Sequence, residues 1–242
     1  MRGIFQGKFD EDELLWRYFR LERFLSMLNE QRVYFASANE FCDPFEGAVE
    51  VCNDRGGSPV LDEYVAGIED AFFQLKRLTK INCWHRASYE SDAMWKLYAG
   101  EHKGVAICTR PNLLRESLRD FRLQPDYGVE ELWGDAVLYV DLTQESLREK
   151  CMLERFFFKH KAFEWEKEFR LAISLRMAEE NGVHVPKLGI FVEADISVLV
   201  EKIVIGSIVS ENDVARIVEG ANNVGLADRV EFSTLLWSPR YA

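Results

Sequence analysis

The sequence is poor in cysteine and histidine, the residues that form disulfides and structural metal sites in small domains. It has five cysteines and four histidines, and neither set shows a C-x-x-C pair or a shared metal-ligand spacing. The first residues also lack the basic-then-apolar pattern of a secretory leader. An odd number of scattered cysteines without such a leader is typical of a reduced compartment. We therefore expect a cytoplasmic protein with no structural zinc site.

Long apolar runs and an excess of positive charge are also missing. No uninterrupted apolar stretch approaches the roughly 20 residues of a membrane helix, so no membrane association is expected. The 30 Lys and Arg residues face 41 Asp and Glu residues, which gives a formal charge of −11. This net charge repels nucleic acids and excludes a general nucleic-acid coat protein. A local basic stretch, Arg148 to Lys161, is either a solvated helix face or a phosphate-binding rim.

Several catalytic signatures are absent as well. The sequence contains no G-x-G-x-x-G, Walker loop, G-x-S-x-G or H-E-x-x-H pattern. Each of these patterns marks a mechanism that needs those residues at that spacing. Their absence argues against classical nucleotide-fold dehydrogenases, P-loop enzymes, α/β hydrolases and zincins.

What the sequence does contain is enough apolar material for a self-sufficient core. It has 242 residues, of which 48% are hydrophobic, and a chain of this length buries most of its unfolded surface. We expect a single α+β domain over residues 1–242. It is expected to have a mixed, mostly antiparallel central sheet, flanking helices and a helical insertion at about residues 52–80.

Local patterns place the main elements along the chain. Extended segments are expected at residues 15–19, 33–37, 81–85, 105–108, 137–140, 162–171, 201–205 and 229–235. Residues 14–28 are expected to pass from a short extended segment into a helix. Further helices are expected at residues 61–78, from Ser91 to the stop at Gly100, from Pro111 onward, at residues 142–161 and after a cap at Ser210. Asp43 before Pro44 predicts a turn, because the proline fixes its own φ and keeps the preceding residue out of the helical region. The last strand, helix and strand resemble a crossover unit, with the pairing of the two strands left open.

The predicted strand at residues 162–171 carries the most informative charge pattern. Glu164, Glu166 and Glu168 alternate along it with apolar residues and so fall on one face. One interpretation is a charged edge strand, protected against pairing with other sheets. The other is a site in which Glu166 or Glu168 orients a sugar or guanidine and stabilises a cationic transition state.

Other candidate residues lie near aromatic rings or turns. Trp95 and Tyr98, three apart on a predicted helix, form either core packing or an aromatic wall for a planar base. Arg17 between Trp16 and Tyr18 suits either a surface position or a phosphate. His102 before Lys103 either binds an anion or forms an ordinary turn.

Four blocks of sequence follow one another in a defined order. They are Leu15 to Phe19; Val33 to Ser37 with Phe41 to Glu46; Met94 to Ala99 with His102 to Ile107; and Trp165 to Arg170. Together they resemble the bacterial family catalogued as domain of unknown function 2971. Cys42 stands where that family usually has Asn, and Phe169 where it usually has Trp. Residues 52–80 lie outside the shared pattern.

The layout of this family is similar to that of ADP-ribosyltransferases, with a polar residue on an early strand, aromatic residues in the middle and a glutamate on a late strand. The resemblance implies a transferase that takes NAD as substrate and modifies a macromolecule, in bacterial phage defence or as a toxin with an antitoxin partner. The resemblance implies that Arg17 or Tyr18 binds NAD near its ribose or phosphates, that Tyr98 or Trp95 stacks on nicotinamide, and that Glu168 or Glu166 bonds the ribose hydroxyl. We therefore expect NAD binding by Arg17, Tyr18, Trp95 and His102, and catalysis by Glu168, Glu166 and Tyr98.

Two other functions fit the same residues. A noncatalytic module could bind a nucleotide or a partner protein in the aromatic and charged cleft. A nuclease-type hydrolase could hold Mg²⁺ with Asp43, Glu46 and the late glutamates, since carboxylates from separate elements are typical ligands of that ion. The glutamate pattern serves all three functions and does not discriminate among them.

Overall fold

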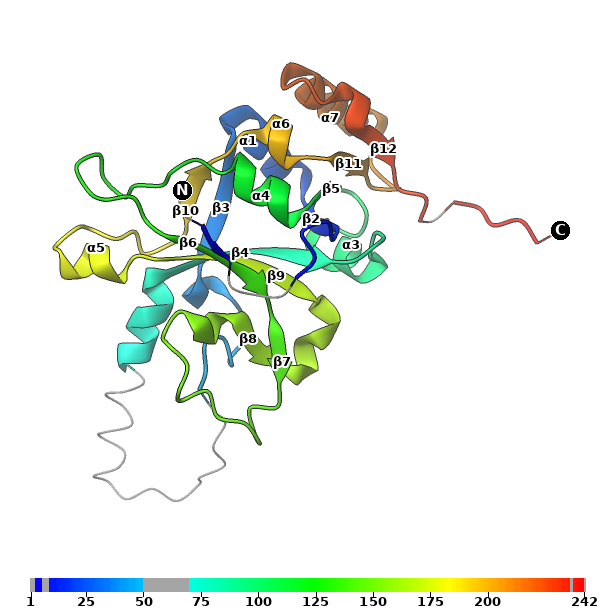
Figure 1. Cartoon of the computed structure of the whole chain (residues 1–242). Helices are drawn as coiled ribbons and strands as arrows, with labels where there is room; N and C mark the ends of the chain where they lie inside the picture. Colours follow the sequence, from blue (N-terminus) through cyan, green and yellow to red (C-terminus); the bar gives the residue numbers. More distant parts are fainter. Residues whose placement is uncertain (1–2, 6–8, 50–69, 236, 242) are drawn as a thin grey trace. The chain divides into compact units, whose positions relative to one another are not determined.

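The computed structural model describes residues 3–5, 9–49, 70–235 and 237–241 (Figure 1). The chain divides into two units, each built from segments far apart in the sequence. Unit 1 contains residues 1–8, 34–83 and 120–191, and unit 2 contains residues 9–33, 84–119 and 192–242. Three strands have residues in both units, namely β3 (Arg32–Ser37), β4 (Thr79–Arg86) and β10 (Ile190–Glu193). The expectation of a single domain stays a prediction.

Strand β9 (Glu168–Ser174) is a central strand of unit 1, and its first six residues are buried. Strand β6 (Leu132–Ala136) pairs with it in antiparallel register and, on its other side, pairs in parallel with β1 (Gly3–Phe5). The part of β3 in this unit pairs antiparallel with β4, with Ser37 opposite Lys80. A separate two-stranded parallel sheet consists of β7 (Leu138–Val140) and β8 (Phe158–His160).

Short helical segments complete unit 1. Residues 70–78 are helical, and a second helix is α5 (Arg176–Glu180). Three 3₁₀ helices are η1 (Ala38–Glu40), η2 (Glu154–Phe157) and η3 (Lys161–Glu166). One apolar cluster of this unit consists of Ala38, Leu75, Ile81, Phe156, Phe157 and Ala172. Loops and short helices are thus tied to the sheet by aromatic packing.

The strand predicted at residues 162–171 is wrong over its first half. Residues up to Glu166 belong to η3, and Lys167 adopts a left-handed conformation with φ of 43° before β9 begins. The His160 imidazole accepts the backbone N–H of Ala162 at 3.2 Å and so supports the start of the 3₁₀ helix. Glu164 is exposed whereas Glu166 and Glu168 are buried, so the three glutamates do not share one charged face.

The helix predicted at residues 142–161 is also wrong. Its start is a turn in which the Asp141 carboxylate accepts the backbone N–H of Thr143 at 3.0 Å. Such side-chain bonds to nearby backbone compete with helix formation. The end of the segment is η2 and β8. Of the predicted helical insertion at residues 52–80, residues 50–69 lie outside the described residues, and residues 70–78 are helical.

Unit 2 contains a sheet in which β2 (Leu15–Phe19) lies between the end of β4 and β5 (Val105–Thr109), antiparallel to both. Strand β11 (Lys202–Ile205) pairs antiparallel with β5, and β12 (Val230–Phe232) pairs parallel with β11. The crossover from β11 through α7 (Glu211–Asn223) to β12 therefore joins neighbouring strands, which answers the question left open above (Figure 1).

Three helices of unit 2 begin at local sequence signals. Ser91 caps α3 (Asp92–Tyr98), and Ser210 caps α7. Pro111 occupies the first position of α4 (Pro111–Ser117), where its missing N–H is harmless. Helix α1 (Leu21–Glu30) packs against α7 across Gly220, and the remaining elements are α6 (Ile196–Leu199) and η4 (Ala227–Arg229).

The α+β fold class and the mixed, mostly antiparallel strand pairing are confirmed. The turn at Asp43 is confirmed too, since its carboxylate accepts the backbone N–H of Phe45 at 2.8 Å. Among the described residues, none of the helices is both long and apolar enough to cross a bilayer.

Candidate functional site

Five charged side chains of unit 1 form a buried group that we call the ionic cluster. Its members are Glu46, Lys159, Glu166, Glu168 and Arg170, and all of them are buried. A charged group in the protein interior is tolerated when an opposite charge and hydrogen bonds replace the lost water. The pairing within the cluster therefore reports which of its groups are ionised.

Both oxygens of the Glu168 carboxylate are bound by cations. Lys159 Nζ donates to Glu168 Oε1 at 2.7 Å, and Arg170 Nε donates to Glu168 Oε2 at 2.5 Å. The remaining Arg170 nitrogens donate to Glu46, from Nη1 to Oε1 at 2.6 Å and from Nη2 to Oε2 at 3.0 Å. Lys159 Nζ also donates to the Glu166 carboxylate. Lys159 thus links the two late glutamates.

Local backbone structure fixes Glu168 at the start of β9. The left-handed residue Lys167 ends η3, and the Tyr139 hydroxyl accepts the backbone N–H of Glu168 at 2.8 Å. Tyr139 on β7 lies opposite Lys159 on β8 in the two-stranded sheet. This small sheet therefore supplies both a bond to the Glu168 backbone and a cation for its side chain.

The ionic cluster carries three carboxyl groups and two cations, so one proton makes it neutral. Burial raises the pKa of Glu166 to about 7, and its hydrogen bond to Glu168 adds to this effect. Burial alone would also raise the pKa of Glu168, but the charge of Arg170 and the bonds to its neighbours hold that pKa well below its ordinary value. Near neutral pH, Glu168 is therefore ionised, whereas Glu166 is divided between its neutral and ionised forms.

A Glu166→Gln variant is expected to flatten the pH dependence of stability. The folded chain binds a proton at Glu166 more tightly than the unfolded chain, because its pKa is raised to about 7 from 4.5. This contribution is fully present below pH 4.5 and is lost as the pH rises through about 7. We expect the melting temperature of the wild type to fall more than that of the variant between about pH 5 and about pH 8.

Thermal melts followed by circular dichroism at several pH values measure this effect. Glu164→Gln is the matched control, because Glu164 is exposed on the same 3₁₀ helix and should keep the wild-type slope. If the melting temperatures of the wild type and Glu166→Gln change equally with pH, the assignment of the proton to Glu166 is contradicted.

In unit 2 the structure brings together three of the predicted cofactor-binding residues, Tyr18, Trp95 and His102. The rings of Tyr18 and Trp95 meet edge to face with centroids 5.2 Å apart, and His102 stacks on Trp95 at 5.7 Å. The Tyr18 hydroxyl accepts the backbone N–H of Ser91 at 2.8 Å. All three rings are buried, so in this conformation they act as a packed group.

Tyr98 and Arg17 lie apart from that packed group. Helix α3 turns Trp95 into the core and leaves Tyr98 51% exposed, so the two rings do not form one open wall. The Arg17 guanidinium lies over the rings of Phe19 and Trp84, at 5.5 Å and 5.7 Å from their centroids. Arg17 and Tyr98 belong to unit 2 and Glu168 to unit 1. A joint site of these three residues stays a prediction.

His102 has one ring nitrogen bonded and one buried without a partner. Its Nε2 lies 2.9 Å from Asp92 Oδ1, and a carboxylate can only accept, so Nε2 carries the proton. Its Nδ1 has no hydrogen-bond partner among the described residues. His102 follows Gly100 and Glu101 in a turn in which all three residues have positive φ. Its anion-binding role stays a prediction.

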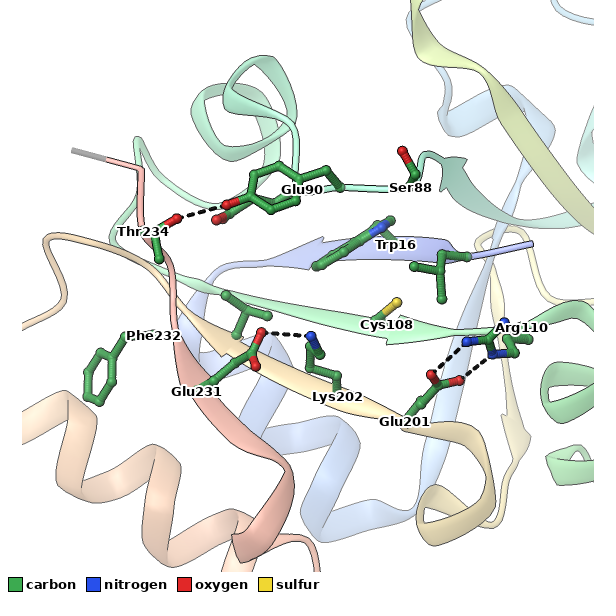
Figure 2. Close-up of a pocket in the computed structure, with 13 residues that line it drawn as sticks. Trp16, Ser88, Glu90, Cys108, Arg110, Glu201, Lys202, Glu231, Phe232 and Thr234 are labelled. Atoms are coloured by element: carbon green, nitrogen blue, oxygen red, sulfur yellow. Dashed lines mark hydrogen bonds and ion pairs between the residues drawn. The ribbon is translucent and has the colours of Figure 1, made fainter. Parts of the chain in front are cut away.

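Unit 2 also contains a pocket of about 320 Å³ that the sequence analysis did not anticipate (Figure 2). Its walls come from β2, β5, β11, β12 and the loop before α3. The pocket is lined in part by charged and apolar side chains, namely Leu14, Trp16, Glu90, Cys108, Arg110, Glu201, Lys202, Val204 and Glu231. Figure 2 shows Trp16 and Cys108 on neighbouring strands, with Arg110–Glu201 and Lys202–Glu231 as two ion pairs.

Sequence reasoning found the two late glutamates but missed the groups that bind them. Arg170 is two residues after Glu168 on one strand, and that alternation was visible. Lys159 was visible only as part of a basic stretch, and Glu46 only as a candidate metal ligand. No sequence signal marks their contacts, because Glu46 and Arg170 are 124 residues apart.

No group of three His, Cys, Asp or Glu side chains within the described parts of the chain is arranged to hold a metal ion. Glu46, proposed above as a Mg²⁺ ligand, is instead bound at both oxygens by Arg170.

Comparison with known proteins gives one match. Residues 94–171 match a family described as protein of unknown function (DUF2971), which confirms the resemblance over that segment. The segment includes α3 from Met94 onward, His102, β5 and the strand residues Glu168 and Arg170. The chain matches no curated protein and no solved structure at a significant level.

Proposed function

The chain carries a segment of the DUF2971 family at residues 94–171, and from this premise we propose that it is an ADP-ribosyltransferase-like enzyme. It takes NAD as substrate, releases nicotinamide and transfers ADP-ribose to a macromolecule. The proposal extends the resemblance described above, in which a late-strand glutamate is the central catalytic group.

The observation that carries the proposal is a pair of buried glutamates that share Lys159, of which only Glu168 is bound by a second cation, Arg170. Glu168 is held ionised by Lys159 and Arg170, whereas burial raises the pKa of Glu166 to about 7. Carboxyl groups whose environments separate their pKa values are typical of acid–base catalysis. A group with a pKa near the working pH can both take and give a proton.

The chemistry assigns one role to each carboxyl group. The bond between C1′ of the ribose and the nicotinamide nitrogen breaks, and its electron pair leaves with nicotinamide. The ribose becomes cationic, and the fixed Glu168 carboxylate stabilises that charge. The acceptor group then bonds to C1′, and its proton passes to Glu166 in the ionised form that this carboxyl group takes when it loses its proton near pH 7. No oxidant, reductant or further reactant is needed.

The biological setting is proposed on the same basis. The substrate is a macromolecule, and the reaction takes place in the cytoplasm of a bacterium, in phage defence or as a toxin held by an antitoxin. Arg17, Tyr18, Trp95, Tyr98 and His102 remain the proposed NAD-contacting residues. Because Trp95 is fully buried, its role requires the helix α3 region to open when NAD binds.

A noncatalytic binding module is the second candidate function. It is favoured by the complete pairing of Glu168, since a carboxylate already bound to two cations stabilises a further cation less strongly. In this alternative the ionic cluster is structural, and ligand binding occurs without a product. The nuclease-type alternative has no comparable support, because Arg170 occupies the Glu46 carboxylate.

Incubation of the purified chain with NAD tests the proposal. We expect free nicotinamide to accumulate, measured by liquid chromatography, with calorimetry run in parallel to measure NAD binding. Heat-unfolded protein provides the blank. Binding without nicotinamide would establish the noncatalytic alternative, and the absence of both would overturn the NAD-dependent class.

A further inference from the structure

Four of the five charged side chains in the unit 2 pocket neutralise one another. Arg110 donates to Glu201 from Nε at 2.7 Å and from Nη2 at 3.0 Å. Lys202 Nζ lies 3.0 Å from Glu231 Oε1. Both pairs are visible along the lower wall in Figure 2. The pocket therefore presents no unpaired cation from these residues to a ligand.

The fifth charged residue, Glu90, is bound by a neutral donor. Trp95 Nε1 donates to Glu90 Oε2 at 2.8 Å. In the described parts of the chain, no Lys or Arg side chain forms an ion pair with this carboxylate. Trp95 is itself fixed between Tyr18 and His102, so the donor has little freedom and orients Glu90. A neutral hydrogen bond positions the negative charge without cancelling it.

The rest of the lining combines three hydroxyl-bearing residues, Ser88, Tyr89 and Thr234, with apolar side chains, and the Tyr89 and Thr234 hydroxyls are hydrogen-bonded to each other at 2.8 Å. Leu14, Trp16, Cys108 and Val204 contribute to the pocket walls. The Trp16 indole N–H already donates to the Ala87 carbonyl at 2.8 Å, so its ring offers carbon surface. A volume of about 320 Å³ is at the lower end for ligand pockets, which limits the occupant to a small molecule or one side chain.

We propose that this pocket binds a small organic cation, an ammonium or guanidinium group on an apolar stem, with Glu90 as its counter-ion. The cation pairs with the half-buried carboxylate, and the stem packs on Trp16, whose ring also attracts positive charge. An anionic ligand is disfavoured, because Arg110 and Lys202 are already neutralised and Glu90 repels it. A neutral ligand leaves the Glu90 charge uncompensated.

This binding site lies outside the ionic cluster, and it shares with the NAD proposal only Trp95, which orients Glu90 and is also a proposed NAD-contacting residue. Every residue that lines the pocket belongs to unit 2, whereas the ionic cluster belongs to unit 1. The test below measures binding only, and nicotinamide release does not enter it. A chain that binds the cation without cleaving NAD, or cleaves NAD without binding the cation, separates the two proposals.

Calorimetric titration with three ligands of one shape tests the inference. Butylguanidinium is the cation, butylurea its neutral counterpart and butyl phosphate an anion. We expect butylguanidinium to bind at millimolar concentrations and the other two to bind at least about tenfold more weakly. Equal binding of butylurea, preferential binding of butyl phosphate, or no binding of butylguanidinium would overturn the proposal.

A matched pair of variants assigns the counter-ion. Glu90→Gln keeps the size of the side chain and an oxygen that can accept from Trp95, and it removes the charge. It is expected to weaken butylguanidinium binding by about tenfold or more while the melting temperature stays near that of the wild type. Glu116→Gln, an exposed position of α4 outside the pocket, should bind as the wild type does. Unchanged binding by folded Glu90→Gln would remove Glu90 as the counter-ion.

Discussion

Replacing Arg170 with methionine is expected to lower the free energy of unfolding by about 3 to 5 kcal/mol. Arg170 is fully buried and binds Glu46 with two nitrogens and Glu168 with a third. Methionine fills a similar volume but leaves the Glu46 carboxylate buried without its cation. The cost is the desolvation of a charge that was paired in the wild type. Urea denaturation followed by circular dichroism measures the loss.

Two further variants separate this effect from a general loss of an arginine. Arg176→Met removes an exposed arginine that pairs with Glu180, and it should change the urea midpoint little, because exposed ion pairs contribute little. Adding Glu46→Gln to Arg170→Met removes the stranded charge and should recover part of the lost stability. If Arg170→Met unfolds at the urea midpoint of Arg176→Met, the ionic cluster does not hold unit 1 together.

The elements that could be predicted from sequence are those with local signals. Ser91 and Ser210 cap helices, and Pro111 starts one, because each acts on backbone groups within three residues of itself. Asp43 forms its turn for the same reason. Strand β2 was predictable from a run of apolar and aromatic side chains. Such signals need no knowledge of distant contacts.

The region from residue 142 to residue 167 could not be predicted because its signals conflict. Alternating charges at Glu164, Glu166 and Glu168 indicate a strand, but Lys167 takes a left-handed conformation that breaks the alternation. Tertiary contacts decide the outcome: Glu166 is buried against Lys159, and the backbone must turn to bring it there. The alternating pattern of residues 162–171 was interpreted as one strand, but the segment is divided between η3 and β9.

The candidate site was predictable in its residue types but not in its connections. Glu166 and Glu168 were identified by charge and spacing, and the structure places both in the ionic cluster. Their cations, Lys159 and Arg170, were seen only as neighbours in sequence. The role of Glu90 could not be anticipated, because it depends on the N–H of Trp95, whose ring was left open between core packing and contact with a ligand and is buried.

The ion pairs of Glu168 with Lys159 and Arg170 fit both a structural and a catalytic role of this residue. The two cations weaken the electric field of the Glu168 carboxylate, but they also fix its position. A fixed charge needs no reorganisation when a cation forms nearby during the reaction. Stability measurements alone do not decide between the two roles, because loss of any member of the ionic cluster disturbs the others. The decisive variant must keep the shape of the side chain and one accepting oxygen and remove the charge.

Glu168→Gln is therefore expected to reduce the rate of nicotinamide release from NAD by about 10² to 10³-fold. Glutamine keeps an oxygen that accepts from Lys159 or Arg170, but it lacks the negative charge that stabilises the ribose cation. The rate is measured by chromatography at a temperature well below the melting temperature of the variant. Circular dichroism confirms that the variant is folded.

Glu164→Gln is the control for this variant, since Glu164 is exposed four residues away and should leave the rate unchanged. Glu166→Gln is expected to behave differently from both. Nicotinamide departure should persist in it, whereas transfer to an acceptor should lose its dependence on pH near 7, where the pKa of Glu166 lies. Wild-type turnover by folded Glu168→Gln would leave the ionic cluster as a structural device, because its central charge would then be irrelevant to the reaction.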